Sequence, residues 1–217
     1  MEHYSQEPQN LDLIARSLRT VGCELGNSQI EQLSLYVAEL LKWNKKSNLT
    51  GFGSEKDVIG NLIADSLAAY SLVDQKTPCS IMDIGTGGGI PGILLKIAIP
   101  TSRLTLVEPN HKKVAFLHLI AGTLGLKKVN IIASRIQQVK NDDQYHGIFD
   151  WIVIKALRLE MALPYVKNVL SHRGHVICWR SETMKNTPEL YGFQVNHEVS
   201  YQLPFGMGQR ILSVLGL

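Results

Sequence analysis

The stretch that decides the fold is MDIGTGGGIPG, residues 82–92. An apolar run leads into Asp83, and Gly85, Gly87 and Gly89 follow at alternating positions before Pro91. Glycine lets the backbone approach a ligand closely, proline suits the first turn of a helix, and a helix N-terminus offers free N–H groups. The stretch therefore predicts a strand, a nucleotide-cofactor loop and a helix. A tight turn without a ligand is the alternative, which three alternating glycines at such a junction disfavour.

The choice of cofactor depends on Asp83. Gly87, Gly89 and Gly92 also match G-x-G-x-x-G, the dinucleotide fingerprint, in which the helix N-terminus receives a pyrophosphate. A buried carboxylate just ahead of that loop would repel it, because two like charges roughly 4 Å apart cost about 4 kcal/mol at an effective dielectric of about 20. S-adenosylmethionine instead carries a cationic amino group and a sulfonium, which Asp83 would attract. We therefore predict S-adenosylmethionine as the cofactor.

Glu108 ends the next predicted strand, where an acidic side chain can accept both ribose hydroxyls of a nucleoside. This interpretation fits either cofactor and does not separate them. Structural alternatives stay open for both carboxylates. Asp83 would then cap the following helix, and Glu108 would pair with Lys112 or Lys113.

The chain from residue 80 onward alternates short apolar or β-branched runs with helical periods. Strands are predicted at 80–84, 103–108, 129–133, 149–154 and 174–179, and helices near 91–98, 110–125 and 158–170. Such alternation predicts an α/β fold with a mostly parallel sheet and helices on both faces. Two further runs, 193–203 and 210–217, predict a closing hairpin that adds an antiparallel edge strand.

The front of the chain is predicted to be helical. Apolar residues recur every three or four positions within 11–22 and again after Ser28, which forms a capping-box pattern with Glu31. Ser54 and Asp57 signal the start of a third helix that continues to about residue 73. Without a repeat or a linker, residues 1–217 read as a single domain, with 1–75 as a helical cap and 76–217 as the cofactor-binding core.

Composition places the chain among ordinary globular proteins. The sequence has 217 residues, 45% of them hydrophobic and 19% charged, and a formal net charge of +3. The N-terminus is polar and no apolar run has the length of a membrane span, so we expect a cytoplasmic protein that binds no membrane. The three cysteines form no C-x-x-C pair and the histidines no ligand spacing, so we predict no metal and structural roles for Cys79 and Cys178.

Several motifs together resemble those of the bacterial 16S ribosomal RNA guanine-N7 methyltransferases, also called glucose-inhibited division protein B. The resemblance covers most of the chain, and its segments are LLKWNKKSNLTG (40–51), IADSL (63–67), DIGTGGGIPGI (83–93), LTLVEPNHKKVAFL (104–117), LGLKKVNIIASRIQQV (124–139), FDWIVIKAL (149–157) and, weakly, GQRILSV (208–214). It implies a Rossmann-like class I methyltransferase fold and S-adenosylmethionine as cofactor. The implied substrate is a specific guanine in 16S rRNA of the small ribosomal subunit or of an assembly intermediate.

The resemblance also assigns roles to residues. It implies cofactor contacts in the glycine loop and after the third strand, at Gly85, Ile90, Ile136 and Gln137. It further implies three basic positioning residues on the cofactor and RNA side, Arg135, Lys155 and Arg210. Our hypothesis is that Arg135 and Lys155 hold a phosphate or the methionine carboxylate.

Three positions depart from the family's usual residues. The family has arginine at the position of Lys155, histidine at that of Leu62 and an aromatic residue at that of Leu157. Lysine keeps the charge but lacks the planar fork of arginine, which can bind a carboxylate or phosphate in a bidentate manner. These departures motivate the alternative of a non-catalytic or retargeted relative that binds S-adenosylmethionine or RNA. A small-molecule or protein methyltransferase is a further alternative, and an NAD-dependent oxidoreductase ranks last because no hydride-transfer residues are evident.

Guanine N7 has a lone pair and no proton, so its methylation needs no general base and depends on alignment of the reactants.

For RNA, lysine clusters at 42, 45 and 46, at 112 and 113, and at 127 and 128 could together line one face. Without an RNA-reading module, we expect recognition of folded RNA shape by the pocket rim. Trp43 either stacks on a base or, as we favour, packs its helix onto the core. We expect a monomer.

Overall fold

The computed structural model describes residues 10–73, 77–184 and 190–217. Its centre is a seven-stranded sheet in the order β3-β2-β1-β4-β5-β7-β6. Strands β1 to β5 are parallel, and β7 lies antiparallel between β5 and β6. The predicted mostly parallel sheet with an antiparallel closing hairpin is therefore confirmed. The strands are β1 (Ser80–Ile84), β2 (Arg103–Val107), β3 (Val129–Ile132), β4 (Phe149–Ile154), β5 (Leu170–Arg180), β6 (Gln194–Gln202) and β7 (Gln209–Gly216).

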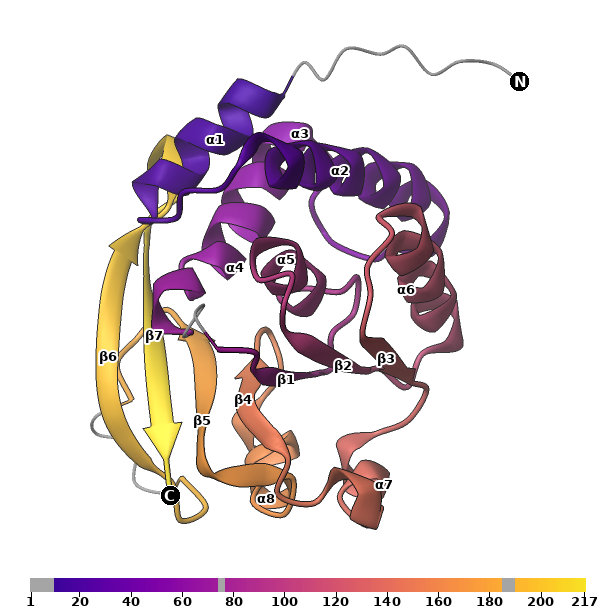
Figure 1. The fold of residues 1–217 in the computed structure, drawn as a ribbon. Helices are drawn as coiled ribbons and strands as arrows, with labels where there is room; N and C mark the ends of the chain where they lie inside the picture. The colour runs from indigo at the N-terminus through magenta and orange to yellow at the C-terminus, as the bar shows by residue number, and fades with distance from the viewer. Residues whose placement is uncertain (1–9, 74–76, 185–189) are drawn as a thin grey trace.

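Helices cover both faces of the sheet (Figure 1). One face carries α1 (Leu11–Thr20), α2 (Asn27–Ser47), α3 (Glu55–Val58), η1 (Ile59–Ala64), α4 (Asp65–Leu67), η2 (Tyr70–Leu72), α5 (Gly92–Ala98) and α6 (His111–Thr123). The shorter elements α7 (Ile136–Val139), η4 (Leu159–Met161) and α8 (Leu163–Val166) contribute to the core on the other face. The short helices η3 (Asp143–Tyr145) and η5 (Pro204–Gly206) lie in connections.

The strand order places the glycine loop at the centre of the sheet. Chain order runs outward from β1 through β2 and β3 on one side and continues with β4 and β5 on the other. Asp83 of β1 is in register with Leu106 of β2 and Val153 of β4. In open α/β sheets the crevice beyond the carboxyl ends of the strands at such a switch point is where ligands bind. The loop that follows β1 therefore lies where proteins with open α/β sheets bind their ligands.

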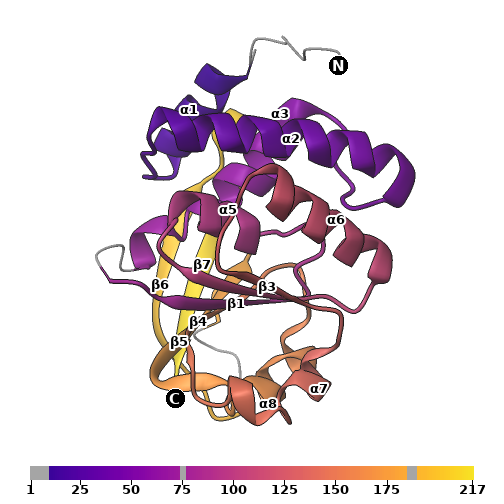
Figure 2. The same ribbon diagram turned by 45° about the vertical axis from the view of Figure 1, so that its right-hand side comes forward.

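The helical cap packs directly on the sheet. One apolar core includes residues of α1, α2 and η1 together with residues of β1, β2 and β5, and α2 crosses over α5 and α6 (Figure 2). The predicted capping box of Ser28 and Glu31 is wrong. Helix α2 begins at Asn27, and the side chain of Gln29 accepts the N–H of Gly26 while donating to the carbonyls of Ile97 and Ala98 at the end of α5.

The predicted third helix, 54–73, forms in several pieces. The Ser54 hydroxyl accepts the N–H of Asp57, as the sequence predicts, and α3 starts there. The chain then passes through the π-helical segment η1 and the short helix α4 before the 3-10 turn η2. π-helical turns are rare in proteins overall, but many of those that occur lie at functional sites. The residues of η1 are therefore candidates for a functional role.

The predicted helix over 158–170 is wrong. Residues 159–161 form the 3-10 turn η4, α8 spans only Leu163–Val166, and β5 already starts at Leu170. Pro164 lies in the first turn of α8. Proline has no N–H to donate and its ring clashes with the preceding turn, so it starts a new helix here rather than continuing one.

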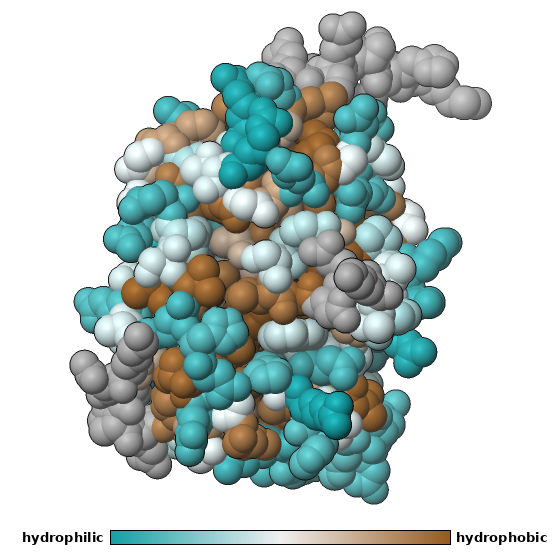
Figure 3. All heavy atoms as spheres, turned by 60° about the vertical axis from the view of Figure 1, so that its left-hand side comes forward, coloured by the Kyte–Doolittle hydropathy of each residue, from teal (hydrophilic) through white to brown (hydrophobic). Residues whose placement is uncertain are grey.

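Strand β6 forms the outer edge of the sheet, and its residues are exposed or half-buried along its length. Figure 3 shows the side of the molecule that includes this edge, where apolar and polar residues lie side by side. Val199 of β6 is an exposed apolar residue. In the described ranges, no helix combines the length and the apolar character that crossing a membrane requires.

Candidate functional site

The glycine loop has the backbone conformation that its sequence predicts. Gly85, Gly87 and Gly89 have φ values of +71°, +58° and +87°, in the left-handed region that residues with a Cβ rarely adopt. A Cβ on Gly89 would also lie 2.4 Å from a side-chain atom of Ile93. The Tyr36 hydroxyl of α2 donates a 2.8 Å hydrogen bond to the carbonyl of Gly88. The helical cap therefore holds the loop in place.

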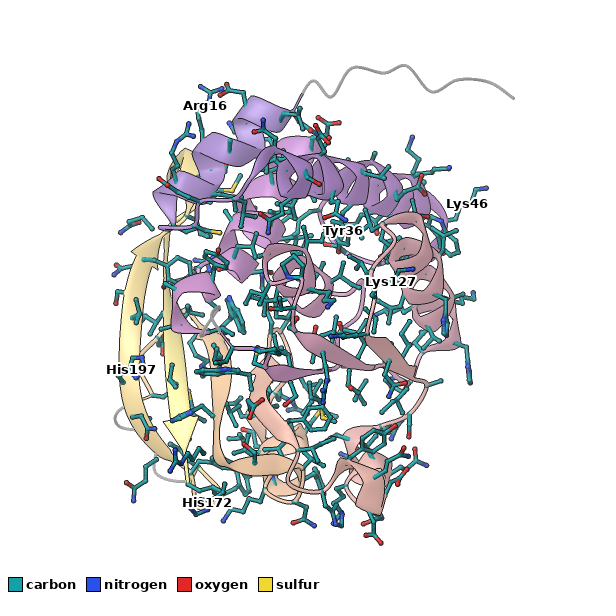
Figure 4. All side chains as sticks on the ribbon, in the orientation of Figure 1. Arg16, Tyr36, Lys46, Lys127, His172 and His197 are labelled. Atoms are coloured by element: carbon teal, nitrogen blue, oxygen red, sulfur yellow. The ribbon has the colours of Figure 1, made fainter. Side chains whose placement is uncertain are left out.

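Tyr36 was not predicted as a site residue. It is fully buried, and Figure 4 shows it pointing from α2 into the molecule. Burial raises the pKa of its phenol, so the hydroxyl stays protonated and remains a donor to the loop. In the sequence Tyr36 looks like any buried residue of a helix, because its partner lies 52 residues away in the chain.

Asp83 is buried beneath the loop, with 1% of its surface exposed. Its Oδ2 atom accepts the hydroxyl of Thr86 at 2.6 Å and the N–H of Gly92 at 2.7 Å, so this atom caps the start of α5. The other oxygen, Oδ1, is buried and has no hydrogen-bond partner among the described residues. The capping alternative therefore accounts for one oxygen and leaves the second available to a ligand.

The burial of Asp83 changes its acidity. Desolvation raises its pKa to about 7, and Glu108 adds to this effect, whereas the two hydrogen bonds and Lys155 oppose it. A cation beside Oδ1 would favour the ionised form. The orphaned buried oxygen and the raised pKa thus fit a ligand that brings a positive charge to this position.

Glu108 follows β2 and is also buried, with 5% of its surface exposed. Its carboxylate accepts the N–H of Gly87 and the N–H of Asn110, each at 2.9 Å. The alternative that it pairs with Lys112 or Lys113 is wrong, because no such ion pair occurs in the parts of the chain that the structure describes. Glu108 instead ties the glycine loop to the start of α6.

Lys155 follows β4 and has its partners in the helical cap. Its ammonium lies 2.7 Å from a carboxylate oxygen of Asp65 and donates to the Ser66 hydroxyl at 3.2 Å and to the Asn61 carbonyl at 3.3 Å. The side chains of Lys155 and Asp65 are only 10% and 8% exposed. Burial lowers the pKa of Lys155, and Asp65 and Asp83 oppose this effect. The three hydrogens of the ammonium are therefore used inside the protein.

Asp65 is the centre of this cluster, and sequence analysis gave it no role beyond its place in the IADSL motif. Its carboxylate also accepts the hydroxyl of Tyr201 at 2.5 Å, and its backbone carbonyl accepts the indole N–H of Trp179 at 2.7 Å. Burial and the carboxylate both raise the pKa of the Tyr201 phenol, so it remains a donor. Side chains from β5, from β6 and from the residue after β4 thus meet at Asp65, two of them at its carboxylate and one at its backbone carbonyl.

Arg210 lies close to this cluster, since its charge affects the pKa values of both Lys155 and Tyr201. It is half-buried, is in register with Tyr201 across the β6–β7 pair, and has no ion-pair partner within the described ranges. Arg135 is exposed at the start of α7, and no hydrogen bond or ion pair of the described residues joins it to Lys155 or Arg210. The structure therefore brings two of the three predicted basic residues together.

Residues predicted to contact adenine lie beyond the carboxyl end of β3. Ile136 is buried and Gln137 is half-buried, with its amide donating to the Met161 carbonyl at 3.2 Å. The N–H of Glu108 donates to the carbonyl of Ile132, so β3 ends next to the predicted ribose residue. Ile90, in the glycine loop, is half-buried.

A strained loop between β6 and β7 lies against η1. Phe205 has φ +61° although it is not glycine, its side chain is 40% exposed, and the Lys56 ammonium lies 5.2 Å from its ring centre. The amide of Asn61, whose carbonyl binds Lys155, contacts the sulfur of Met207 at 3.2 Å. Such strain is often retained at functional sites.

The lysine clusters do not all lie at the carboxyl edge of the sheet. Lys113 lies near the loop, 3.9 Å from where a Cβ on Gly87 would be, whereas Lys127 and Lys128 precede β3 and therefore lie at the amino edge. Figure 4 shows Lys46 at the end of α2, apart from Lys127. The prediction that the clusters line one face fails for Lys127 and Lys128, because α6 runs antiparallel to the strands.

Trp43 and the cysteines have structural surroundings. Trp43 is half-buried against Phe116, with ring centres 5.6 Å apart, which confirms the packing interpretation. Cys79 and Cys178 are buried, and burial raises the pKa of the Cys178 thiol to about 12. A thiol with that pKa holds almost no thiolate at neutral pH and is a poor nucleophile.

Comparison with known proteins identifies the chain's relatives. The model of the GidB family, rRNA small subunit methyltransferase G, matches residues 29–203. The chain belongs to the GidB family. Among proteins named ribosomal RNA small subunit methyltransferase G, that of Alkaliphilus oremlandii is 31% identical over 89% of this chain and 84% of its own length. That of Geobacter metallireducens is 30% identical over 94% and 95%, respectively.

Solved structures bear out the fold. A SAM-dependent methyltransferase from Aquifex aeolicus matches with a TM-score of 0.55 and 15% identity, over 79% of this chain and 98% of its own. A ribosomal protein L11 methylase from Lactobacillus delbrueckii matches with a TM-score of 0.53 and 17% identity, over 76% and 80%. The Rossmann-like class I methyltransferase fold is therefore confirmed.

The three positions that depart from the family's usual residues differ in their surroundings. Leu62 is buried in η1, and Leu157 packs over Gly85, with a methyl group 3.4 Å from where a Cβ on Gly85 would be. Lys155 uses its single ammonium to bind the cap. The two leucines therefore lie in apolar surroundings, and the lysine is paired with a carboxylate.

Proposed function

We propose that this GidB-family methyltransferase transfers a methyl group from S-adenosylmethionine to N7 of a specific guanine in 16S rRNA. The observation that carries the cofactor is the buried Oδ1 atom of Asp83, which lacks a partner among the described residues at the end of β1. Family membership supports the rRNA substrate. The choice of N7 follows from the resemblance to guanine-N7 methyltransferases.

The residues present fit S-adenosylmethionine. Asp83 would accept a hydrogen bond from the amino group of the ligand, and the left-handed glycines would let its methionine part approach the backbone. Glu108 would accept hydrogen bonds from the ribose hydroxyls, with the lone pairs that the N–H groups of Gly87 and Asn110 leave free. Ile90, Ile136 and Gln137 would border the nucleoside. When bound, S-adenosylmethionine supplies the methyl group on a cationic sulfur, ready for in-line attack.

The role of the protein in this reaction is alignment. Guanine N7 attacks with its own lone pair, so no residue has to remove a proton, and holding the two reactants in line contributes most of the rate enhancement. The Asp65–Lys155 ion pair fixes the end of β4 against the cap beside this site. Arg210, half-buried and without an ion-pair partner within the described residues, is the cation that we assign to an RNA phosphate. We reassign Lys155 from holding a ligand to positioning.

The substrate-facing rim in this proposal includes the loop between β6 and β7. Phe205 is exposed there beside Lys56, and an aromatic ring with a neighbouring cation suits contact with an RNA base and its phosphate. We expect the substrate to be a folded RNA of the small subunit or of an assembly intermediate, bound by a monomer in the cytoplasm.

The test is methylation of 16S rRNA by the purified chain. Small subunits from cells that lack this protein are incubated with radiolabelled S-adenosylmethionine, and N7-methylguanosine is measured by mass spectrometry of digested rRNA. We expect one modified guanine in the wild type and a reduced rate in Arg210→Ala with unchanged affinity for S-adenosylhomocysteine. Binding of the cofactor without any rRNA methylation would contradict the proposal and leave a non-catalytic relative.

A further inference from the structure

A cavity lies at the edge of the sheet opposite the glycine loop. Its volume is about 630 Å³, and its lining includes Ser80, Arg103 and Phe149, at the first positions of β1, β2 and β4. Because these strands are parallel, their first residues mark the amino edge, whereas Asp83 and Lys155 lie at the carboxyl edge. A volume of this size is typical of sites for small organic ligands, which occupy roughly 300–1,000 Å³.

The floor of this cavity carries a hydroxyl on a mostly buried residue. Thr105 lines the cavity, is 8% exposed, and its side chain makes no hydrogen bond to any residue that the structure describes. It is in register with Met82 on one side and with Asn130 on the other, and Asn130 also lines the cavity. The floor therefore offers a hydroxyl without a protein partner among the described residues, beside an amide that also donates to the Tyr145 hydroxyl at 3.2 Å.

The rim of the cavity carries two cations. Arg103 and Lys128 both line it, and the N–H of Leu104 donates to the Lys128 carbonyl at 3.0 Å, so the two residues lie on adjacent segments. Neither has an ion-pair partner in the described ranges. Lys128 has φ +58°, a backbone conformation that costs a non-glycine residue roughly 1–3 kcal/mol and persists where the surroundings or a function enforce it.

One acidic residue also lines the cavity. The carboxylate of Asp150 accepts the N–H and the hydroxyl of Ser80 at 2.9 Å and 2.7 Å, and it contacts the Ser171 hydroxyl at 3.4 Å. These donors occupy Asp150, whereas the two cations of the lining have no ion-pair partner among the described residues. The charged side chains of the lining therefore have a net charge of +1, from two cations and one carboxylate.

We propose that this cavity binds a small organic phosphate of about mononucleotide size, with its phosphate between Arg103 and Lys128 and its polar body against Thr105 and Asn130. A guanidinium suits phosphate because it presents several donors in a fixed plane. The apolar lining, including Leu104 and Val129, would cover the remaining surface of the ligand. The site does not share a residue with the proposed cofactor site and does not rest on the methyltransferase function.

The test uses the full chain saturated with S-adenosylhomocysteine, so that the cofactor site is occupied. Cytidine 5'-monophosphate, ribose 5-phosphate and inorganic phosphate are titrated separately and followed by calorimetry and by amide chemical shifts. We expect saturable binding of the two organic phosphates, with shifts at Thr105 and Asn130 and none in the glycine loop. Inorganic phosphate is expected to bind at least about tenfold more weakly, because it makes none of the floor contacts.

Variants locate the site. Arg103→Gln and Lys128→Gln are each expected to weaken binding of cytidine 5'-monophosphate about tenfold, and Thr105→Val about threefold. Lys127→Gln is the matched control, because Lys127 is an exposed neighbour outside the lining, and it should bind as the wild type does. All four should keep their affinity for S-adenosylhomocysteine, which shows that they fold.

Two results would overturn the proposal. The absence of saturable binding by either organic phosphate would show that the cavity is no such site. Equal affinity for all three probes, or an unchanged affinity in Arg103→Gln, would leave an adventitious ion only. Neither result affects the methylation assay, so failure here is distinguishable from failure of the proposed function.

Discussion

Binding of S-adenosylhomocysteine should release a proton from Asp83. Burial raises the pKa of this carboxyl group to about 7, so about nine-tenths of the ligand-free protein carries the proton at pH 6. The amino group of the ligand, with a pKa of about 8, is still cationic there. If the ionised carboxylate binds it, each binding event at pH 6 releases about 0.9 proton.

The same argument fixes the pH dependence of affinity. The ionised fraction of Asp83 falls from about one half at pH 7 to about 3% at pH 5.5, so the dissociation constant should rise about 16-fold over this range, or about 1.6 kcal/mol. Calorimetry in two buffers of different ionisation enthalpy measures the released proton, and titrations across the range measure the affinity. Asp83→Asn is the matched control, because its amide can accept the same N–H and hydroxyl but cannot ionise.

Proton release near zero at pH 6, with an affinity that does not change down to pH 5.5, would refute the reasoning. It would mean that Asp83 is ionised without the ligand or that the ligand does not need its charge. The stability of the ligand-free protein changes with pH in the opposite direction to the affinity: it falls as the pH rises. Between its ordinary pKa of 3.8 and about 7, the folded protein keeps a proton that the unfolded chain has lost, so the ligand-free wild type should lose stability relative to Asp83→Asn as pH rises through this window.

Three further comparisons test the architecture, each by urea unfolding of the variants named. Tyr36→Phe removes the 2.8 Å hydrogen bond to the Gly88 carbonyl and should lower the free energy of unfolding by about 1–3 kcal/mol and weaken cofactor binding; an unchanged midpoint would contradict this. Gly92→Ala should destabilise, since its Cβ would lie 2.6 Å from the nearest side-chain atom, whereas Gly122→Ala, with open space around it in α6, should stabilise by up to about 1 kcal/mol; equal effects would contradict this. Asp65→Asn leaves a buried lysine without its partner and should cost about 3–5 kcal/mol, part of which is restored when that lysine is also replaced by methionine; purely additive effects would argue against the ion pair.

Several features of the fold and the site depend on local requirements and could be predicted from the sequence. The alternating glycines needed no tertiary information, because positive φ is a property of single residues, and Gly85, Gly87 and Gly89 all adopt it. The alternation of strands and helices also sufficed for the parallel sheet, because a parallel pair needs a crossover connection. Placement of Asp83 at the start of the loop followed from its position after a short apolar strand.

Several of the predictions that failed depend on contacts between distant segments, whereas the predicted helix over 158–170 failed for a local reason, the proline in the first turn of α8. The start of α2 is set by Gln29, whose amide also binds the carbonyls at the end of α5, 68 and 69 residues away. The partners of Lys155 lie 89 and 94 residues away at Ser66 and Asn61. Such pairs leave no pattern in the sequence, because each of these residues is an ordinary polar residue within its own segment.

The sequence by itself thus determined the backbone of the cofactor loop, the class of the sheet and the charge placed behind the loop. The tertiary structure alone decided which of those charges remain available to a ligand. It pairs Lys155 with Asp65, leaves Arg210 without an ion-pair partner among the described residues and leaves one oxygen of Asp83 without a hydrogen bond. The physical reason is that conformational preference belongs to a residue and its neighbours, whereas desolvation and pairing depend on whatever the fold packs against it.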